Sequence, residues 1–477
     1  MPVPAEAPEV VEHPGDPVDA TAPRRTPVWQ VGLAFVLLAG VYTAISLVRW
    51  RTLSATTFDL GVFTQVVQQW AELEVPVVHL TGDSLIASHH FSPALAALAP
   101  AYALVPSPLT LLVEQALLVA LGVVPLMRHA GRHGRVLPWA VAVSYGLAPG
   151  LCSLVGFDLH EVALAVPLLA FSMTAILDER FQAAVLWALP IVLVKEDLGL
   201  TLAAIGFAVL VRGERRLGVI TMVGGLVITA ATVLWVLPAL DGSTGYYYSD
   251  AFAPGSVGEA WATLRQSLPT KAGTVLVLLA PTALLALGSP LVLVVLPTLA
   301  WRFTSDRASF WGTGFQYDAV LVPVVVAAMI DTVRRLPRRA VVVVSVVAVA
   351  ATLFLVPRYD AGDLLHPDRW QAQERMPEVL AALATVPDGA RVAASNDLGP
   401  RLVSRTELYF FGDPALEVGP VTRLPDFGNI DWIAYDRAYE TVVPTGRATL
   451  DGLLASGRFR VVTERGGVVV ARRVGGE

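Results

Sequence analysis

Ionisable side chains interrupt the long apolar runs of this chain at a few places. Asp59 follows the first apolar run, and the pair His89-His90 follows Asp59. Denser groups lie at Asp158-Leu159-His160-Glu161 and at Lys195-Glu196-Asp197, each between two apolar runs. A charge at bilayer depth costs roughly 3 kcal/mol, so such residues are functional candidates by default.

The first two of these places each allow a structural and a chemical interpretation. Asp59 lies among Phe58, Leu60 and Phe63, where it either caps a helix or acts as a general base or metal ligand. Either His89 or His90 can face a substrate, because adjacent side chains rarely point into the same site. The alternative is a pair of interfacial histidines that make ordinary hydrogen bonds.

The two dense groups suit metal and phosphate chemistry. Carboxylate and imidazole ligands together fit Mn²⁺ or a similar cation, so Asp158, His160 and Glu161 are predicted metal ligands. Their spacing matches no closed structural zinc site. Lys195 can hold a phosphate, while Glu196 and Asp197 can accept a proton or contact the substrate. A divalent metal, Mg²⁺ or Mn²⁺, is therefore the predicted cofactor.

A later polar segment precedes and opens another apolar run. Arg302 and Arg307 are predicted to clamp a donor phosphate, with solvated loop charges as the alternative. Gln316 and Tyr317 are candidate substrate contacts, although aromatic residues are common at membrane interfaces in any case.

Composition places the chain among membrane proteins. Of its 477 residues 55% are hydrophobic and 16% are charged, and the mean hydropathy is +0.60. These values lie beyond those of ordinary soluble domains. The net charge of −6 argues against a nucleic-acid partner. The single cysteine, Cys152, lies in an apolar run and excludes an intramolecular disulfide.

The lengths of the apolar runs predict about 11 transmembrane helices, because a bilayer core needs about 20 apolar residues and fewer in short or interrupted helices. The expected spans are 28–48, 107–127, 137–155, 161–177, 183–194, 198–211, 217–239, 273–288, 290–301, 318–333 and 340–356. Basic residues favour one set of connecting segments: Arg24, Arg25, Arg128, Arg132, Arg135, Arg180, Arg212, Arg215, Arg216, Arg334, Arg335, Arg338 and Arg339. The positive-inside rule then predicts a cytoplasmic N-terminus and places all the clusters above on the outer face.

Three regions follow from this map. Residues 1–27 are predicted to form a disordered cytoplasmic tail, and residues 28–357 the transmembrane domain. Its external loop, 49–106, has helical apolar spacing that predicts amphipathic helices on the membrane surface. Residues 358–477 alternate short strands and helices, with strands near 391–395 and 430–435 and a hairpin of 459–463 with 468–472. They are predicted to form a small extracytoplasmic α/β domain.

Several motifs together resemble a known family. They are Phe58-Asp59-Leu60-Gly61-Val62-Phe63, His90-Phe91-Ser92-Pro93, Phe157-Asp158-x-His160-x-x-Ala163, Val194-Lys195-Glu196-Asp197 and Ala394-Ser395-Asn396-x-Leu398-Gly399-Pro400. In this order they resemble a family of bacterial polytopic membrane proteins that carries a domain of unknown function and is placed among the GT-C-fold glycosyltransferases. The resemblance runs from about Thr56 into the C-terminal domain.

The resemblance implies a GT-C-like helical bundle in the bacterial inner (plasma) membrane that acts on the outer face. It implies transfer of a hexosyl or pentosyl group from a polyprenyl-phosphate donor to a glycan, lipid or protein acceptor. Asp59 would be the catalytic acid or base, although GT-C enzymes often pair two acids in this loop and the nearest here are Glu72 and Glu74. Gln316-Tyr317 with Pro323 resembles a donor-site segment that has histidine in place of glutamine.

Two other functions remain open from the sequence. A secondary transporter also places ionisable groups near broken helices, although usually at the membrane midplane. A non-catalytic scaffold with a degenerate GT-C core is the other, and it predicts that Asp59, Lys195 and Asp158 do not converge.

Overall fold

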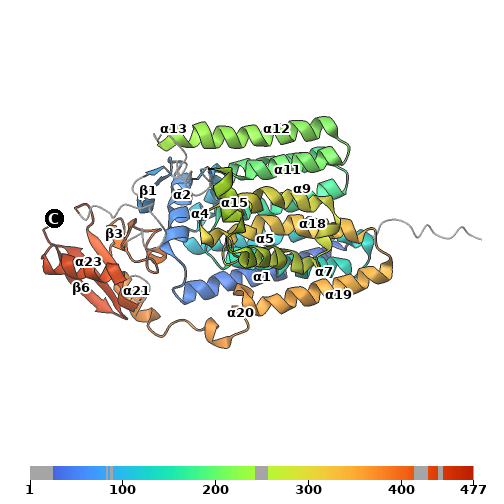
Figure 1. The fold of residues 1–477 in the computed structure, drawn as a ribbon. Coiled ribbons are helices and arrows are strands. Elements are labelled where there is room, and N and C mark those ends of the chain that lie inside the picture. The colour runs from blue at the N-terminus through green and yellow to red at the C-terminus, as the bar shows by residue number, and fades with distance from the viewer. Residues whose placement is uncertain are drawn as a thin grey trace, which may run out of the picture.

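The protein is described by a computed structural model that covers residues 25–81, 84–85, 90–241, 256–412, 428–438 and 444–475. Most of its helices lie side by side in one bundle, and a small domain with a β-sheet sits at one end of that bundle (Figure 1). A mostly helical membrane-protein architecture with a small C-terminal sheet was predicted from the sequence, and the structure confirms it.

Five helical runs of the described residues are long and apolar enough to cross a bilayer, or six if one bent pair counts as a single span. They are α1 (Val28–Arg51); Pro108–His133 with α5 (Pro108–Leu121) and α6 (Val123–Ala130); Arg215–Leu240 with α12 (Arg215–Ala231); Gln316–Val333 with α18 (Val322–Val333); and Arg338–Arg358 with α19 (Arg338–Leu355). The bent pair is α7 (Leu137–Gly146) and α8 (Pro149–Val155), at 45°.

Shorter apolar helices occupy the remaining expected spans. They are η5 (Glu161–Leu164) with α9 (Ala165–Leu177), α10 (Phe181–Ala188) with η6 (Leu189–Leu193), α11 (Leu198–Val211), α16 (Leu268–Leu279), η9 (Leu285–Gly288), and η10 (Pro290–Val295) with α17 (Leu296–Thr304). Ala283 and Leu284 adopt left-handed backbone angles and interrupt the helical run between α16 and η9. Interrupted helices of this kind are tolerated at membrane depth only when protein packs around them.

Burial separates the centre of the bundle from its rim. The apolar window of the α18 run is 89% buried, whereas those of the α12 and α19 runs are each 22% buried. Most valines and leucines on α12 and α19 are therefore exposed on the bundle surface, such as Val227 and Val343. Lipid is the environment that removes such side chains from water.

The 49–106 segment is built from short elements at the end of the bundle. After the π-helical turn η1 (Thr57–Gly61) come α2 (Val62–Ala71), β1 (Val77–Val78) with β2 (Ser84–Leu85), η3 (Pro93–Leu98) and α4 (Ala99–Leu104). The apolar side of α2, including Phe63, Val66 and Val67, packs in one core cluster with strand residues of the C-terminal domain. Protein, and not the membrane surface, therefore covers the apolar side of α2.

The C-terminal domain contains a five-stranded mixed sheet in the order β4-β3-β5-β7-β6. The strands are β3 (Arg391–Ala394), β4 (Glu407–Phe410), β5 (Trp432–Asp436), β6 (Phe459–Arg465) and β7 (Val468–Arg473), with helices α21 (Met376–Leu383) and α23 (Pro444–Ala455). β3 pairs in parallel with β4 and β5, and the β6–β7 hairpin adds antiparallel to β5. The sequence predicted every strand of this sheet except β4.

Candidate functional site

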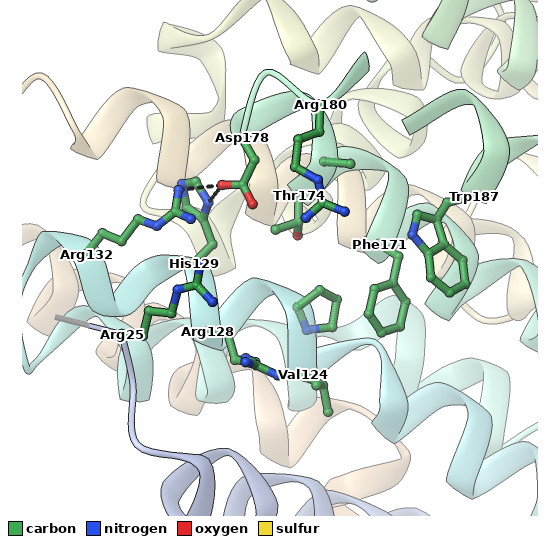
Figure 2. Close-up of a pocket in the computed structure, with 12 residues that line it drawn as sticks. Arg25, Val124, Arg128, His129, Arg132, Phe171, Thr174, Asp178, Arg180 and Trp187 are labelled. Atoms are coloured by element: carbon green, nitrogen blue, oxygen red, sulfur yellow. Dashed lines mark hydrogen bonds and ion pairs between the residues drawn. The ribbon is translucent and has the colours of Figure 1, made fainter. Parts of the chain in front are cut away.

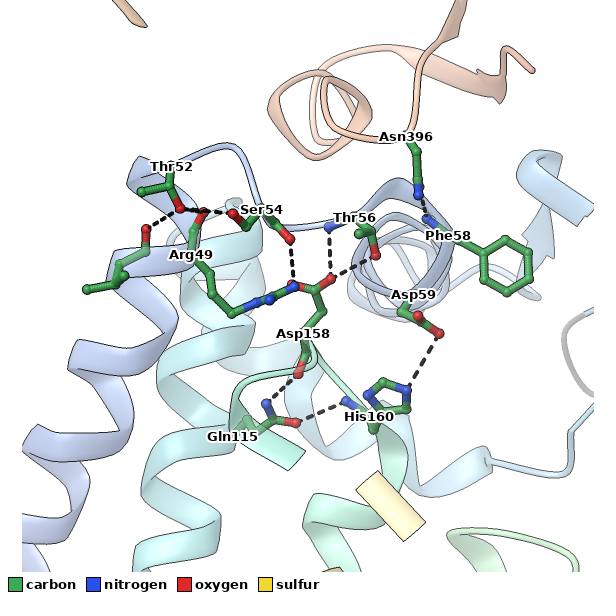
Figure 3. A network of polar contacts seen from close by, with 11 residues as sticks. Arg49, Thr52, Ser54, Thr56, Phe58, Asp59, Gln115, Asp158, His160 and Asn396 are labelled. Atoms are coloured by element: carbon green, nitrogen blue, oxygen red, sulfur yellow. Dashed lines mark hydrogen bonds and ion pairs between the residues drawn. The ribbon is translucent and has the colours of Figure 1, made fainter. Parts of the chain in front are cut away.

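Asp59 and His160 form the centre of the candidate site. Asp59 lies on η1, and its Oδ1 is 3.5 Å from His160 Nε2 (Figure 3). The His160 side chain is 4% exposed and the Asp59 side chain 21%, so the carboxylate is the partner that solvent or a substrate can reach. The imidazole stacks on Phe157 with ring centroids 5.3 Å apart, which fixes its orientation. A carboxylate beside a fixed imidazole is suited to accepting a proton.

Asp158 faces away from His160 and holds the chain before η1. The backbone N–H and the hydroxyl of Thr56 both donate to Asp158 Oδ2 at 2.8 Å, and Arg49 Nη2 lies 3.5 Å from Oδ1. Gln115 donates to the Asp158 carbonyl at 2.6 Å and accepts from the His160 backbone N–H at 3.0 Å. One glutamine thus fixes both ends of the turn that presents the imidazole, while Asp158 anchors the turn that presents Asp59.

The C-terminal domain holds η1 from the opposite side. The Asn396 carbonyl accepts hydrogen bonds from the Thr57 backbone N–H and hydroxyl, each at 2.6 Å. The Asn396 side-chain oxygen accepts from the Phe58 backbone N–H at 3.1 Å (Figure 3). At Gly399 an added Cβ would lie 2.1 Å from the Thr57 hydroxyl, so the Thr57 side chain packs directly against the Gly399 backbone. These bonds satisfy amides at the start of the turn that carries Asp59, as a helix cap does.

The 195–197 cluster ties three other segments to the site. Lys195 Nζ donates to Glu161 Oε1 at 2.8 Å, directly after His160 in the chain. Glu196 lies 2.9 Å from His90 Nδ1. Asp197 accepts from the Trp301 indole N–H at 3.0 Å. Lys195 is 15% exposed and Glu161 2%, so the ammonium group is the more accessible end of its pair.

Aromatic rings line the approach to these charges. Phe157 packs edge-on against Phe315 at 4.8 Å, and Phe315 lies 6.0 Å from the Tyr317 ring. The centroid of the Tyr317 ring lies 5.5 Å from the Arg302 guanidinium group and 5.0 Å from the Phe310 ring, which packs edge-on against it. The predicted contact Gln316 is 8% exposed, and within the described chain its side-chain oxygen has no hydrogen-bond partner.

The two arginines predicted to bind phosphate occupy different positions. Arg302 is fully buried and donates to the carbonyls of Phe310 and Gly312 at 2.9 and 2.8 Å and to Asp318 Oδ1 at 2.5 Å. Phosphate binding by Arg302 would require these bonds to break, so the structure gives it the role of holding the 305–315 loop. Arg307 is half-buried, with its guanidinium 5.9 Å from the Phe310 ring centroid.

The structure therefore brings together part of the predicted site. Asp59, His160, Glu161, Lys195 and Tyr317 cluster, and Glu196 links His90 to them. His89 lies outside the described residues. Across those residues, no group of three His, Cys, Asp or Glu side chains is arranged to hold a metal ion. Asp158 is turned toward Arg49 and Glu161 toward Lys195, which leaves the predicted metal ligands divided among separate contacts.

Two residues that matter for the geometry were not predicted as site residues. Gln115 is a fully buried amide within an apolar run, and that mismatch is a sequence signal for a polar contact. Asn396 belongs to a quoted motif, but its partner η1 lies 338 residues away and no local pattern indicates that contact.

Comparison with known proteins supplies the family. The model of a family described as predicted membrane protein (DUF2079) matches residues 49–470, which is most of the chain. The chain belongs to the DUF2079 family. No curated protein matches the sequence of this DUF2079 protein.

Two solved structures share the fold of this DUF2079 protein. The first is ArnT from Cupriavidus metallidurans bound to undecaprenyl phosphate, with 14% identity and a TM-score of 0.54 over 94% of this chain and 99% of ArnT. The second is the apo state of the same protein, with 12% identity and a TM-score of 0.56 over 94% and 98% of the two chains. ArnT is a GT-C glycosyltransferase, so the GT-C-like fold implied by the sequence motifs is confirmed. At this identity the likeness concerns the fold alone.

Proposed function

We propose that this DUF2079 protein is a GT-C glycosyltransferase that moves a sugar from a polyprenyl-phosphate donor to an acceptor hydroxyl on the outer face of the bacterial cell membrane. The observation that carries the proposal is the Asp59–His160 contact beside the Lys195–Glu161 pair, at one end of an ArnT-like bundle. ArnT has been seen with undecaprenyl phosphate, and this supports a polyprenyl donor here.

The side chains support a simple division of roles. An acceptor hydroxyl attacks the anomeric carbon of the sugar, and the bond from that carbon to the phosphate oxygen breaks. Asp59 accepts the hydroxyl proton, while His160 holds the carboxylate in place. The ammonium group of Lys195 stabilises the negative charge on the leaving polyprenyl phosphate. The rings of Phe157, Phe315 and Tyr317 form an apolar wall against which the sugar and the first isoprene units can pack.

The proposal includes an orientation and a number of spans. The chain is taken to cross the membrane about 11 times, with the shorter apolar helices completing the spans and the C-terminal domain outside the cell. Support comes from the arginines: Arg25, Arg128, Arg132 and Arg180 line one pocket near the start of α1, and Asp59 lies beyond the other end of that helix. Basic residues gather on the cytoplasmic side of membrane proteins.

A divalent metal, Mg²⁺ or Mn²⁺, remains part of the proposal as an aid to phosphate departure, but no step above depends on it. The predicted ligands Asp158, His160 and Glu161 do not share one coordination point in the described structure. Activity measured with a chelator and with each added cation tests this part separately.

The decisive experiment compares wild type with Asp59→Asn in proteoliposomes supplied with radiolabelled polyprenyl-phosphate sugars and membrane-extract acceptors. Loss of the general base should lower the transfer rate by about 10²–10⁴-fold. Asp306→Asn is the matched control, because Asp306 is an exposed acid in the loop after α17 and is not one of the residues assigned to the site. Full transfer by Asp59→Asn would show that Asp59 is not the base. If the wild-type protein transfers none of the sugars, the proposal that it is a glycosyltransferase is refuted.

A further inference from the structure

A second charged site lies at the opposite end of the bundle. A pocket of about 250 Å³ is lined by residues from the segment before α1, from α6 and the turn after it, from α9, and by Arg180 and Trp187, which lie just before α10 and in its last turn (Figure 2). The site at Asp59 follows the far end of α1, where Arg49 contacts Asp158. The 24 residues of α1 span about 36 Å, so the two sites lie on opposite faces of a bilayer. We call this second site the basic pocket.

Cations outnumber anions in the basic pocket. Asp178 contacts Arg132 and a histidine, with Oδ1 2.5 Å from Arg132 Nη1 and 2.8 Å from His129 Nδ1. The other three arginines of the lining have no ion-pair partner within the described part of the chain: Arg25, Arg128 and Arg180. Three guanidinium groups from three segments line this one pocket and repel one another, and an anion bound in the pocket would relieve that repulsion. Guanidinium forks match phosphate oxygens in geometry.

An aromatic wall adjoins these charges. Phe171 and Trp187 stack with ring centroids 4.6 Å apart, and Trp187 is 41% exposed. Trp187 lies about 10 Å along the α10–η6 helix from Arg180, so the aromatic pair lies deeper along this apolar run than that arginine. A ligand with a charged head and an apolar body would therefore meet both surfaces of the pocket, whereas a small free anion would use only the arginines.

We propose that the basic pocket binds a phosphate group on the membrane face opposite Asp59. An anionic phospholipid and free phosphate are the two sources of this chemistry, and the aromatic wall favours the lipid. Basic pockets between transmembrane helices are known to bind anionic lipid headgroups. The proposal rests on the pocket alone and does not depend on glycosyl transfer.

The test uses the purified full chain in neutral detergent, with binding followed by native mass spectrometry. Phosphatidylglycerol and phosphatidylcholine are added in parallel, and the variant is Arg128→Gln with Arg180→Gln. Wild type should bind phosphatidylglycerol in preference to phosphatidylcholine. Removing two charges, each contributing about fivefold, should weaken that binding by about 25-fold. Both arginines are exposed, so the variant should fold normally, which its melting temperature checks.

Arg216→Gln is the matched control, because Arg216 is an exposed arginine in the first turn of α12 and does not line the pocket. It should bind phosphatidylglycerol like wild type. Equal loss in this control, or unchanged binding in the double variant, would overturn the proposal. Inorganic phosphate and glycerol phosphate in a thermal-shift assay separate the two sources. If inorganic phosphate or glycerol phosphate raises the melting temperature of wild type but not of the double variant, the pocket binds a soluble phosphate. If neither raises the melting temperature and phosphatidylglycerol is still preferred over phosphatidylcholine, the pocket binds the lipid.

Discussion

Replacing Asp318 by asparagine tests whether Arg302 is locked into the structure or free to bind phosphate. The two side chains form an ion pair of 2.5 Å with exposed fractions of 0% for Arg302 and 3% for Asp318. Asparagine keeps the shape of the side chain but leaves the guanidinium without its counter-charge. Breaking a buried ion pair from one side costs about 3–5 kcal/mol, because the remaining charge stays out of water. We expect a loss of that size in the free energy of unfolding.

Asp363 provides the matched control for this prediction. Its carboxylate lies 3.8 Å from Arg369, and the two side chains are 49% and 59% exposed. Solvent screens such a pair, so Asp363→Asn should cost less than about 1 kcal/mol. The comparison therefore isolates burial, since both variants remove one carboxylate from an Arg–Asp pair.

The assay is equilibrium unfolding in mixed micelles of neutral detergent and SDS, followed by tryptophan fluorescence. Trp301 lies next to Arg302 and Trp311 lies within the 305–315 loop, so their emission reports on the relevant region. The double variant Arg302→Met Asp318→Leu removes both charges. Its loss in the free energy of unfolding should be smaller, by about 2–3 kcal/mol, than the sum of the losses for Arg302→Met alone and Asp318→Leu alone. A loss for Asp318→Asn no larger than that of the control would refute the assignment and return Arg302 to the phosphate-binding candidates.

Two further predictions concern the C-terminal domain. Asn396→Ala removes the acceptor for the Phe58 N–H, which should lower the free energy of unfolding by about 1–2 kcal/mol and slow any transfer reaction about fivefold to thirtyfold. The control Ser404→Ala removes only the hydrogen bond from the Tyr102 hydroxyl at the same interface and should leave the transfer rate within twofold. Equal effects of the two substitutions would contradict a positioning role for Asn396. Burial and the neighbouring Asp436 carboxylate hold the pKa of Asp397 well above its usual range, so the folded domain retains a proton there that the unfolded chain releases as pH rises. The stability contribution of Asp397 therefore falls as pH rises above its unfolded pKa of about 3.9. The melting temperature of Asp397→Asn relative to wild type should rise more at pH 8 than at pH 5. An equal change in melting temperature at the two pH values would count against the raised pKa.

Much of the architecture follows from local patterns in the chain. Apolar runs of bilayer length mark the helices, and the alternation in 459–472 marks the β6–β7 hairpin. The strand β4 was not predicted; it lies at the edge of the sheet, where β3 is its one pairing partner among the described strands. Short strands depend on a distant partner more than on their own composition.

The sequence by itself determined which residues are ionisable at the ends of apolar runs, and therefore the pool from which a site can be built. Only the tertiary structure decided how that pool divides. Asp158 turns to Arg49 and Thr56, while His160, two residues later, turns to Asp59. Arg302 turns inward to Asp318, 16 residues away. The physical reason is that a buried charge must meet a partner, and the chain fold sets which partner is within reach.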